Sequence, residues 1–196
     1  MSLIQDGSGQ GYIARVNSDN RLYTFADSVP SGANAAANKR MWSIFSGDVT
    51  QTDDNESGLL YISYSGTSKL VISQIAYTVG TSTGGSGSTA YRFVANPLDG
   101  TLVSTATQAS IINRNLSGVS GSLIGNQYSG TQGATITGGS DLGVVSLGSG
   151  FLSQDESKNP FILETGNSIA VGVTPPTGNT SQTNRIFLTV YELVVD

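Results

Sequence analysis

Apolar and polar residues alternate along much of the chain, with the period of two that is typical of strands buried on one face. Clear examples are residues 60–64 and 70–77, which are separated by the short polar segment 65–68. We expect these two segments to be neighbouring strands joined by a turn. The same pattern predicts further strands at residues 12–16, 22–25, 42–45, 90–95, 169–174 and 186–195. It therefore predicts an all-β fold.

Two segments lack this alternation and are expected to be loops. Residues 81–88 consist of Gly, Ser and Thr, a composition that resists packing into a core and suits a flexible tip or a long hairpin loop. Between residues 113 and 150 the apolar residues thin out and glycine recurs every few positions. We expect this extended, loop-rich excursion to hold only short strands, with isolated apolar residues that find partners across a subunit interface.

Residues 31–40 depart from the strand pattern in a different way. They follow Pro30, offer Ser31 as an N-cap and are rich in alanine, the strongest helix former. We therefore expect one short helix in this segment.

The 196-residue chain has 25 glycines and neither histidine nor cysteine. Its length suits a single domain over residues 1–196, because an all-β sandwich can reach roughly 200–250 residues around one core. Without histidine, the chain lacks the commonest metal ligand and the side chain that most often acts as a general base. Without cysteine, it has neither disulfides nor thiolate metal sites. These absences exclude His- and Cys-dependent catalysis and favour a function based on shape.

The net charge of −5 and the charged fraction of only 12% limit the possible partners. Nucleic-acid binding depends on clustered Lys and Arg, whereas the nine basic residues here are scattered, so we expect no nucleic-acid partner. The first residues show no secretory signal, and no apolar run approaches the roughly 18 residues of a membrane span. We expect a soluble protein, made in the cytoplasm of its producer, with no membrane partner.

Candidate catalytic and ligand-binding motifs are weak. The acidic cluster 53–56 lacks the ligand spacing of a calcium loop and is better explained as a solvated turn. The glycine-rich segments 7–11, 84–87 and 148–150 lack the Gly-Lys-Ser/Thr ending of a phosphate-binding loop. No serine stands three residues before a lysine, as a Ser-x-x-Lys nucleophile requires. We therefore expect no catalytic residue, no cofactor and no metal ion.

Carboxylates and aromatic side chains leave two alternatives open. Two acids that converge in space can hydrolyse glycosides, and the candidates are Asp6, Asp27, Asp99, Asp141, Glu164 and Glu192. Exposed tyrosines can stack on a saccharide, although most aromatic residues alternate with Leu, Ile or Val and are expected in the core.

Several turn and strand motifs follow one another in a fixed order and cover most of the chain. They comprise residues 6–17 with 20–22, then 55–62, 113–118, 133–139, and finally 166–171 with 174–181. Examples are Asn-Arg-Asn-Leu-Ser-Gly at 113–118 and Gly-Ala-Thr-Ile-Thr-Gly-Gly at 133–139. In this order the motifs resemble those of a family of tailed-bacteriophage virion structural proteins. The resemblance implies a small β-sandwich of the phage particle and supplies no catalytic residue.

The resemblance and the composition together lead to the hypothesis of a noncatalytic head decoration, or cement, protein. We expect a β-sandwich of jelly-roll type, as a homotrimer on the virion head surface that assembles in the host cytoplasm and bridges the major capsid protein subunits. Residues 1–11 are expected to form an N-terminal arm. The candidate interface residues are Leu3, Ile4, Tyr12, Leu123, Ile124, Tyr128 and Ile136. The alternative is a tail-tip or fibre-associated module that binds a host saccharide, and a carboxylate-based hydrolase is a third, weaker hypothesis.

Overall fold

The computed structural model describes residues 4–5, 13–14, 35–36, 38–98, 107–115, 123, 125–150 and 152–193, with the backbone alone for 4–5, 13–14 and 152–160. Contacts between residues divide the chain into two units, Met1–Pro30 and Ser31–Asp196. In the first unit, β1 (Ile4–Gln5) pairs antiparallel with β2 (Ile13–Ala14). Part of the expected N-terminal arm is therefore a short strand.

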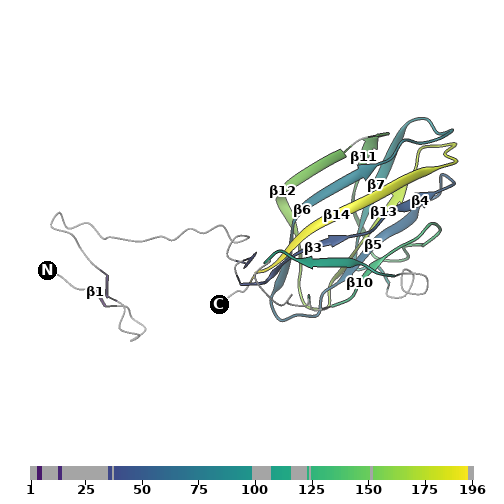
Figure 1. The fold of residues 1–196 in the computed structure, drawn as a ribbon. Coiled ribbons are helices and arrows are strands. Elements are labelled where there is room, and N and C mark those ends of the chain that lie inside the picture. The colour runs from purple at the N-terminus through teal and green to yellow at the C-terminus, as the bar shows by residue number, and fades with distance from the viewer. Residues whose placement is uncertain are drawn as a thin grey trace, which may run out of the picture. The chain divides into compact units, whose positions relative to one another are not determined.

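The second unit contains two antiparallel sheets (Figure 1). The first sheet has the strand order β11-β7-β13-β5-β10-β8. Its strands are β5 (Ser57–Ser63), β7 (Ser88–Ala95), β8 (Thr107–Gln108), β10 (Gln127–Ser129), β11 (Ser140–Gly148) and β13 (Ser168–Thr174). The second sheet has the order β12-β6-β14-β3-β9, and β4 also pairs with β14. Its strands are β3 (Met41–Phe45), β4 (Val49–Gln51), β6 (Lys69–Val79), β9 (Ser110–Asn113), β12 (Leu152–Leu163) and β14 (Gln182–Leu193).

The two sheets share one hydrophobic core. Its buried side chains come from both sheets, for example Leu60 and Val173 from the first and Ile44, Ile72 and Leu188 from the second. The rings of Tyr91 on β7 and Tyr77 on β6 contact each other with their centroids 4.9 Å apart. The Tyr91 hydroxyl also donates a hydrogen bond to a carbonyl oxygen of β6. The inward half of each alternating strand is therefore buried against the other sheet, which explains why period two dominates the sequence.

The all-β prediction is confirmed, and most of the predicted strands are present. Residues 42–45, 60–64, 70–77, 90–95, 169–174 and 186–195 correspond to β3, β5, β6, β7, β13 and β14. The predicted pairing of the two clearest strands was wrong, because β5 pairs with β10 and β13 while β6 pairs with β12 and β14. The turn between β5 and β6 crosses from one sheet to the other. Residues 12–16 contain β2, and residues 22–25 lie outside the described residues.

The short helix predicted for residues 31–40 is only partly present. Ala35 and Ala36 are helical, residues 38–40 are not, and residues 31–34 and 37 lie outside the described residues. Lys39 has a φ of 61°, and the N–H groups of Lys39 and Arg40 donate to the carbonyl oxygens of Ala36 and Ala35 at 3.0 and 2.7 Å. This pair of bonds around a left-handed residue ends a helix. The prediction was therefore wrong for residues 38–40.

The excursion at residues 113–150 is less loop-rich than predicted. It contains β11, a nine-residue strand that pairs with β7 along its whole length. Residues 130–139 form a loop, as expected. The prediction of only short strands failed because β11 is held by a long-range pairing, and because its exposed side chains give no clear apolar pattern.

Candidate functional site

The outer face of the second sheet, which points away from the core, carries an ordered set of apolar side chains. Trp42 and Ile44 of β3 and Leu188 and Val190 of β14 belong to the core, so the residues between them face outwards. One outward row runs across four strands through Ile162, Val71, Tyr191 and Met41. A second row pairs Phe187 with Phe45, and Ile112 of β9 lies opposite Ser43. We call these seven apolar residues, Met41, Phe45, Val71, Ile112, Ile162, Phe187 and Tyr191, the apolar face.

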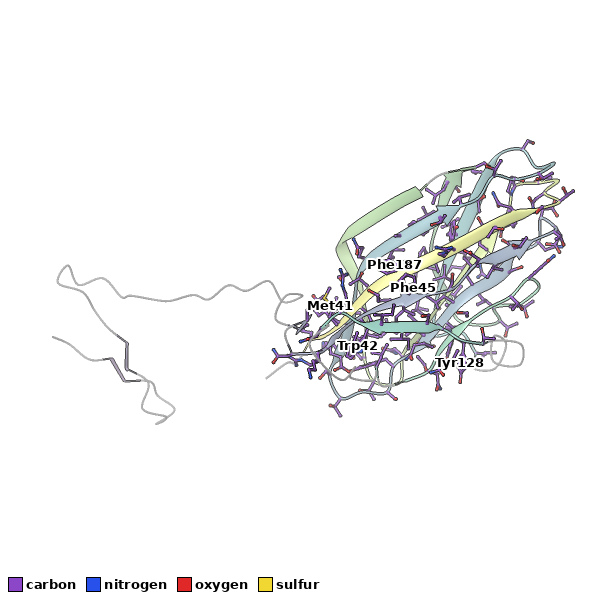
Figure 2. All side chains as sticks on the ribbon, viewed as in Figure 1. Met41, Trp42, Phe45, Tyr128 and Phe187 are labelled. Carbon is purple, nitrogen blue, oxygen red and sulfur yellow. The ribbon has the colours of Figure 1, made fainter. Side chains whose placement is uncertain are left out.

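Several side chains of the apolar face are open to solvent. Ile112 and Ile162 are 50% and 52% exposed, and Met41, Phe45, Phe187 and Tyr191 are partly exposed. The rings of Phe45 and Phe187 have their centroids 4.8 Å apart, and Figure 2 shows them together on neighbouring strands. Single exposed apolar side chains are common, whereas several on the outer face of one sheet are typical of a protein contact surface.

A polar row crosses the middle of the apolar face. Thr189 is 1% exposed, and its hydroxyl donates to Gln74 Oε1 at 2.9 Å and accepts from Arg114 Nη1 at 3.2 Å. Ser73 Oγ donates to the carbonyl oxygen of Thr189 at 3.2 Å. These bonds pair the hydroxyl and the carbonyl oxygen of Thr189, so a partner can cover this buried residue without leaving either group unpaired.

The edge strand β11 of the first sheet is a second exposed apolar feature. Leu142 and Val144 are 48% and 58% exposed, and the strand has Asp141 as its one charged residue. Beside it, a cavity of about 160 Å³ is lined by Leu142, Phe161 and Ile162, among others. An edge strand without lysine or proline presents unpaired backbone groups to an incoming strand, and an adjacent cavity can receive one of that strand's side chains.

The loops at one end of the second unit are tied together by buried amide side chains. Asn184 Nδ2 donates to Gln51 Oε1 at 3.0 Å and to Gln182 Oε1 at 3.1 Å, and all three residues are at most 1% exposed. Thr89 donates to Gln182 Oε1, and Asn179 Nδ2 donates to the carbonyl oxygen of Gln51. We call these five residues the amide cluster. Gln51 Nε2 also donates to the Val173 carbonyl oxygen at 3.2 Å, so the cluster connects the ends of β4, β7, β13 and β14.

The Gly/Ser/Thr segment 81–88, for which we expected a flexible tip, joins this network. Ser82 Oγ donates to Asn179 Oδ1 at 2.7 Å, and the Thr83 N–H donates to the Ser181 carbonyl oxygen at 2.9 Å. The N–H of Thr180 donates in turn to the Thr83 carbonyl oxygen at 2.8 Å. The segment is the connection between β6 and β7, and these bonds hold it against the β13–β14 loop.

The acidic cluster 53–56 makes hydrogen bonds within the protein. Asp53 Oδ1 accepts from the Asn55 N–H, and Asp54 Oδ2 accepts from the Gly178 N–H. Glu56 forms a two-pronged ion pair with Arg92, through Nε at 2.7 Å and Nη2 at 2.5 Å, and Arg92 Nη1 also contacts Asp141 at 2.7 Å. These contacts agree with the interpretation as a turn. Among the described residues, no three acidic side chains lie close enough to hold a metal ion.

The other candidate carboxylates are held by separate partners. Glu164 pairs with Lys69 at 2.9 Å, Glu192 accepts from the Tyr64 hydroxyl at 2.9 Å, and Asp141 pairs with Arg92. Asp6, Asp27 and Asp99 lie outside the described residues. Asp141, Glu164 and Glu192 therefore each contact a different partner, and Asp141 meets a second acid, Glu56, only through the Arg92 guanidinium that pairs with both.

Among the described residues, three groups have pKa values moved from their usual range. Burial, followed by the hydrogen bond to Glu192, raises the pKa of Tyr64 to about 12. Burial also raises the pKa of Tyr91. The hydrogen bond to Glu56 raises the pKa of Arg92 above its already high value. None of these shifts brings a group towards neutral pH, where a general acid or base would be most effective.

The seven predicted interface residues fall in different places. Tyr128 and Ile136 are partly buried against a small cluster of Tyr61, Ala134 and Ala170 on the outside of the first sheet, where the Tyr128 and Tyr61 rings stack with centroids 6.4 Å apart. Leu123 is 6% exposed and packs in the main core of its own chain. Ile4 lies in β1, and Leu3, Tyr12 and Ile124 lie outside the described residues.

Sequence reasoning missed the apolar face and the β11 edge. The alternation of apolar and polar residues in β3 and β14 identified the side chains that point into the core. Which of their outward side chains lie next to one another depends on strand order and register, which the sequence does not show. The signal was nevertheless present in the outward positions of β14, where Phe187 and Tyr191 stand where polar residues are usual.

Comparisons with known proteins add no relative. No family model matches the chain, and no curated protein matches it significantly. Within the described residues, no helix has the length and apolar character needed to cross a membrane.

Proposed function

We propose that the chain is a noncatalytic structural protein of a tailed-bacteriophage particle that decorates the head and bridges subunits of the major capsid protein. The observation that carries this proposal is the apolar face, in which two groups of apolar side chains flank a buried polar row on one sheet. Such a surface suits repeated packing, because each of many identical contacts adds a small stabilisation to the shell.

We also propose that the second unit is a β-sandwich of jelly-roll type. If β3, β5, β6, β7, β11, β12, β13 and β14 are numbered one to eight along the chain, one sheet has the order 1-8-3-6 and the other 2-7-4-5. Consecutive strands thus alternate between sheets, apart from the pair β7 and β11, as in two interleaved Greek keys. In this arrangement β8, β9 and β10 are insertions between the fourth and fifth strands.

The β11 edge supports a bridging role. It presents an apolar strand without lysine, beside a cavity that can hold a side chain. The apolar face belongs to one sheet and the β11 edge to the other, and Ile162 borders both. Together they form one contact area across the two sheets, which neighbouring capsid subunits can share. A homotrimer would multiply these contacts threefold, in keeping with the expected assembly.

The test is the location of the chain in virions of the phage that encodes it. Cryo-electron microscopy is expected to show it on the head, in contact with capsid subunits through the apolar face or the β11 edge. A position on the tail, or absence from the particle, would refute the proposal.

Binding to particles that lack the chain tests the surface itself. We expect Ile112→Lys with Ile162→Lys to lower occupancy at least tenfold, because two charges would be buried in the contact. Thr177→Lys is the matched control, since Thr177 is exposed on the β13–β14 loop away from the apolar face. Equal occupancy of both variants would exclude the apolar face as the contact.

A further inference from the structure

A cavity of about 350 Å³ lies at the end of the second unit opposite the amide cluster. It forms where β5 and β7 end and β13 begins, and its lining comes from the ends of these strands and from the segments next to them, residues 64–65, 96–98 and 166–168. Its volume is at the lower end of the range for small-molecule sites, roughly 300–1,000 Å³. The size suits a small compact ligand better than a peptide segment.

Hydrogen bonds between the loops hold the walls of this cavity in place. The Asn96 N–H donates to the Ser168 carbonyl oxygen at 2.8 Å, and the Ser168 N–H donates back to Asn96 Oδ1 at 2.9 Å. The Tyr64 N–H donates to the Asn167 carbonyl oxygen at 3.0 Å, and the Gly166 N–H donates to the Tyr64 carbonyl oxygen at 2.8 Å. The site is therefore formed before any ligand arrives, which lowers the entropic cost of binding.

Asn96 has an unusual backbone conformation at this position. Its φ is 46°, in the left-handed region that residues other than glycine seldom adopt. Because its Oδ1 accepts from Ser168, the amide is fixed with Nδ2 free to donate, and Nδ2 has no partner among the described residues. Strained residues of this kind recur at ligand sites, where the surrounding structure holds them in place.

The lining combines apolar surface with uncharged polar groups. Tyr61, Pro97 and Leu98 supply the apolar part, and Leu98 is 65% exposed at the rim. The hydroxyls of Ser65 and Ser168, like Asn96 Nδ2, make no hydrogen bond to the described residues. No Asp, Glu, Lys or Arg is among the described lining residues.

This combination defines the class of ligand. An ionic ligand would find no opposite charge, and an apolar ligand would leave the polar groups buried and unpaired. A sugar ring offers hydroxyls for the polar groups and C–H surface for the tyrosine, proline and leucine side chains. We propose that this cavity binds an uncharged monosaccharide unit of a glycan, with Ser65, Asn96 and Ser168 as its hydrogen-bonding residues. This inference goes beyond the head-decoration proposal and does not depend on it.

The experiment titrates the isotope-labelled full chain with glucose, galactose, mannose, rhamnose and N-acetylglucosamine, and follows backbone amide signals by NMR. At least one sugar is expected to shift the amide signals of residues 64–66, 96, 98 and 166–168 in a saturable way. Glucuronic acid, which carries a charge, is expected to bind at least tenfold more weakly than the best neutral sugar.

Variants then locate the binding. Ser65→Trp fills the mouth of the cavity and is expected to abolish the shifts. Ser86→Trp is the matched control, because Ser86 is also an exposed loop serine but precedes β7, at the opposite end of that strand from Asn96. Ser168→Ala removes one hydroxyl and keeps both backbone bonds to Asn96, and it is expected to weaken binding about threefold to tenfold.

The outcomes are decisive in both directions. Saturable binding of a neutral sugar that is lost in Ser65→Trp and kept in Ser86→Trp supports the proposal. Absence of binding by all five neutral sugars overturns it, as does binding unaffected by both Ser65→Trp and Ser168→Ala. The sugar titration does not measure where the chain lies in the virion, so a negative result would not contradict the head-decoration proposal.

Discussion

At the scale of single residues, the amide cluster shows most clearly how buried polar side chains hold strands and loops of this protein in place. Gln51, Gln182 and Asn184 are almost completely buried, yet the Asn184 side chain joins β14 to β4 through Gln51 and also bonds to Gln182 of its own strand. Buried polar groups stabilise the folded state only when they are hydrogen-bonded. If one partner is removed, the remaining groups stay buried without hydrogen bonds, which costs free energy.

Asn184→Leu tests this argument. The change keeps the approximate volume but removes the donor that serves both glutamine oxygens, so we expect unfolding to become easier by about 1–3 kcal/mol. The measurement is the free energy of unfolding in urea. Thr50→Val is the control, because the hydroxyl bond of Thr50 to Thr183 is exposed and its loss should cost less than about 0.5 kcal/mol. Equal effects of the two variants would show that the cluster does not stabilise the fold.

Tyr64 gives a prediction about alkaline pH. Its pKa is raised to about 12 in the folded chain, whereas an unfolded tyrosine ionises near 10. The neutral hydroxyl is therefore favoured by folding, and this stabilisation is complete below about pH 10 and is lost as the pH rises towards 12. The raised pKa of the Tyr91 hydroxyl acts in the same direction.

Tyr64→Phe isolates the contribution of Tyr64. At neutral pH we expect the variant to be less stable, because the bond to Glu192 is lost. Between about pH 10 and 12 the difference should shrink, since the variant has no hydroxyl to ionise at this position. Urea unfolding at several pH values measures this, with tyrosinate absorbance as an independent record of ionisation. A difference that stays constant across this range would contradict the assigned cause.

At the scale of elements, the connection that leads into β10 depends on a glycine. Gly125 has a φ of 132°, and a Cβ placed on it would lie 2.0 Å from the carbonyl oxygen of Ser63 at the end of β5. The backbones therefore approach too closely for any side chain. This approach lets β10 begin its pairing with β5 two residues later, at Gln127.

Gly125→Ala is expected to destabilise the fold by more than about 2 kcal/mol, since strain and a backbone clash act together. Gly133→Ala is the matched control: Gly133 also has a positive φ, 79°, but no atom lies within 4 Å of its added Cβ. It should cost about 1 kcal/mol, from the backbone conformation alone. Thermal and urea unfolding of both variants measure the difference, and equal costs would rule out the clash.

The elements also show what the sequence can predict and what it cannot. β3, β5, β6, β7, β13 and β14 were predicted because each buries one face in the core, which leaves period two in the sequence. β12 was missed because most of residues 153–160 are polar, and it is held as a strand by its pairing with β6. The apolar face could not be predicted, because Phe45 and Phe187 meet only once β3 and β14 are paired in the observed register.

At the scale of the whole molecule, charge and shape point to the same kind of function. In the second unit, the described acidic side chains accept hydrogen bonds in turns or form ion pairs. Apolar side chains are exposed on one sheet face and at one sheet edge. Uncharged amide side chains hold the loops at one end in place. Covering a surface of this kind costs little desolvation free energy, because few charged groups are removed from water. This suits close packing against other proteins.

Removal of residues 1–30 tests whether the first unit contributes to folding or to binding of the capsid. All described members of the main core lie within Ser31–Asp196, so we expect residues 31–196 to fold alone with the urea midpoint and slope of the full chain.

Under the proposed function, the first residues add separate contacts to the coat, so the shortened chain should occupy particles more weakly, by about tenfold or more. Occupancy of particles that lack the chain measures the second effect, with the full chain as reference. An unfolded 31–196 fragment would show that the first unit is needed for the fold, and full occupancy by a folded fragment would exclude an arm that binds the coat.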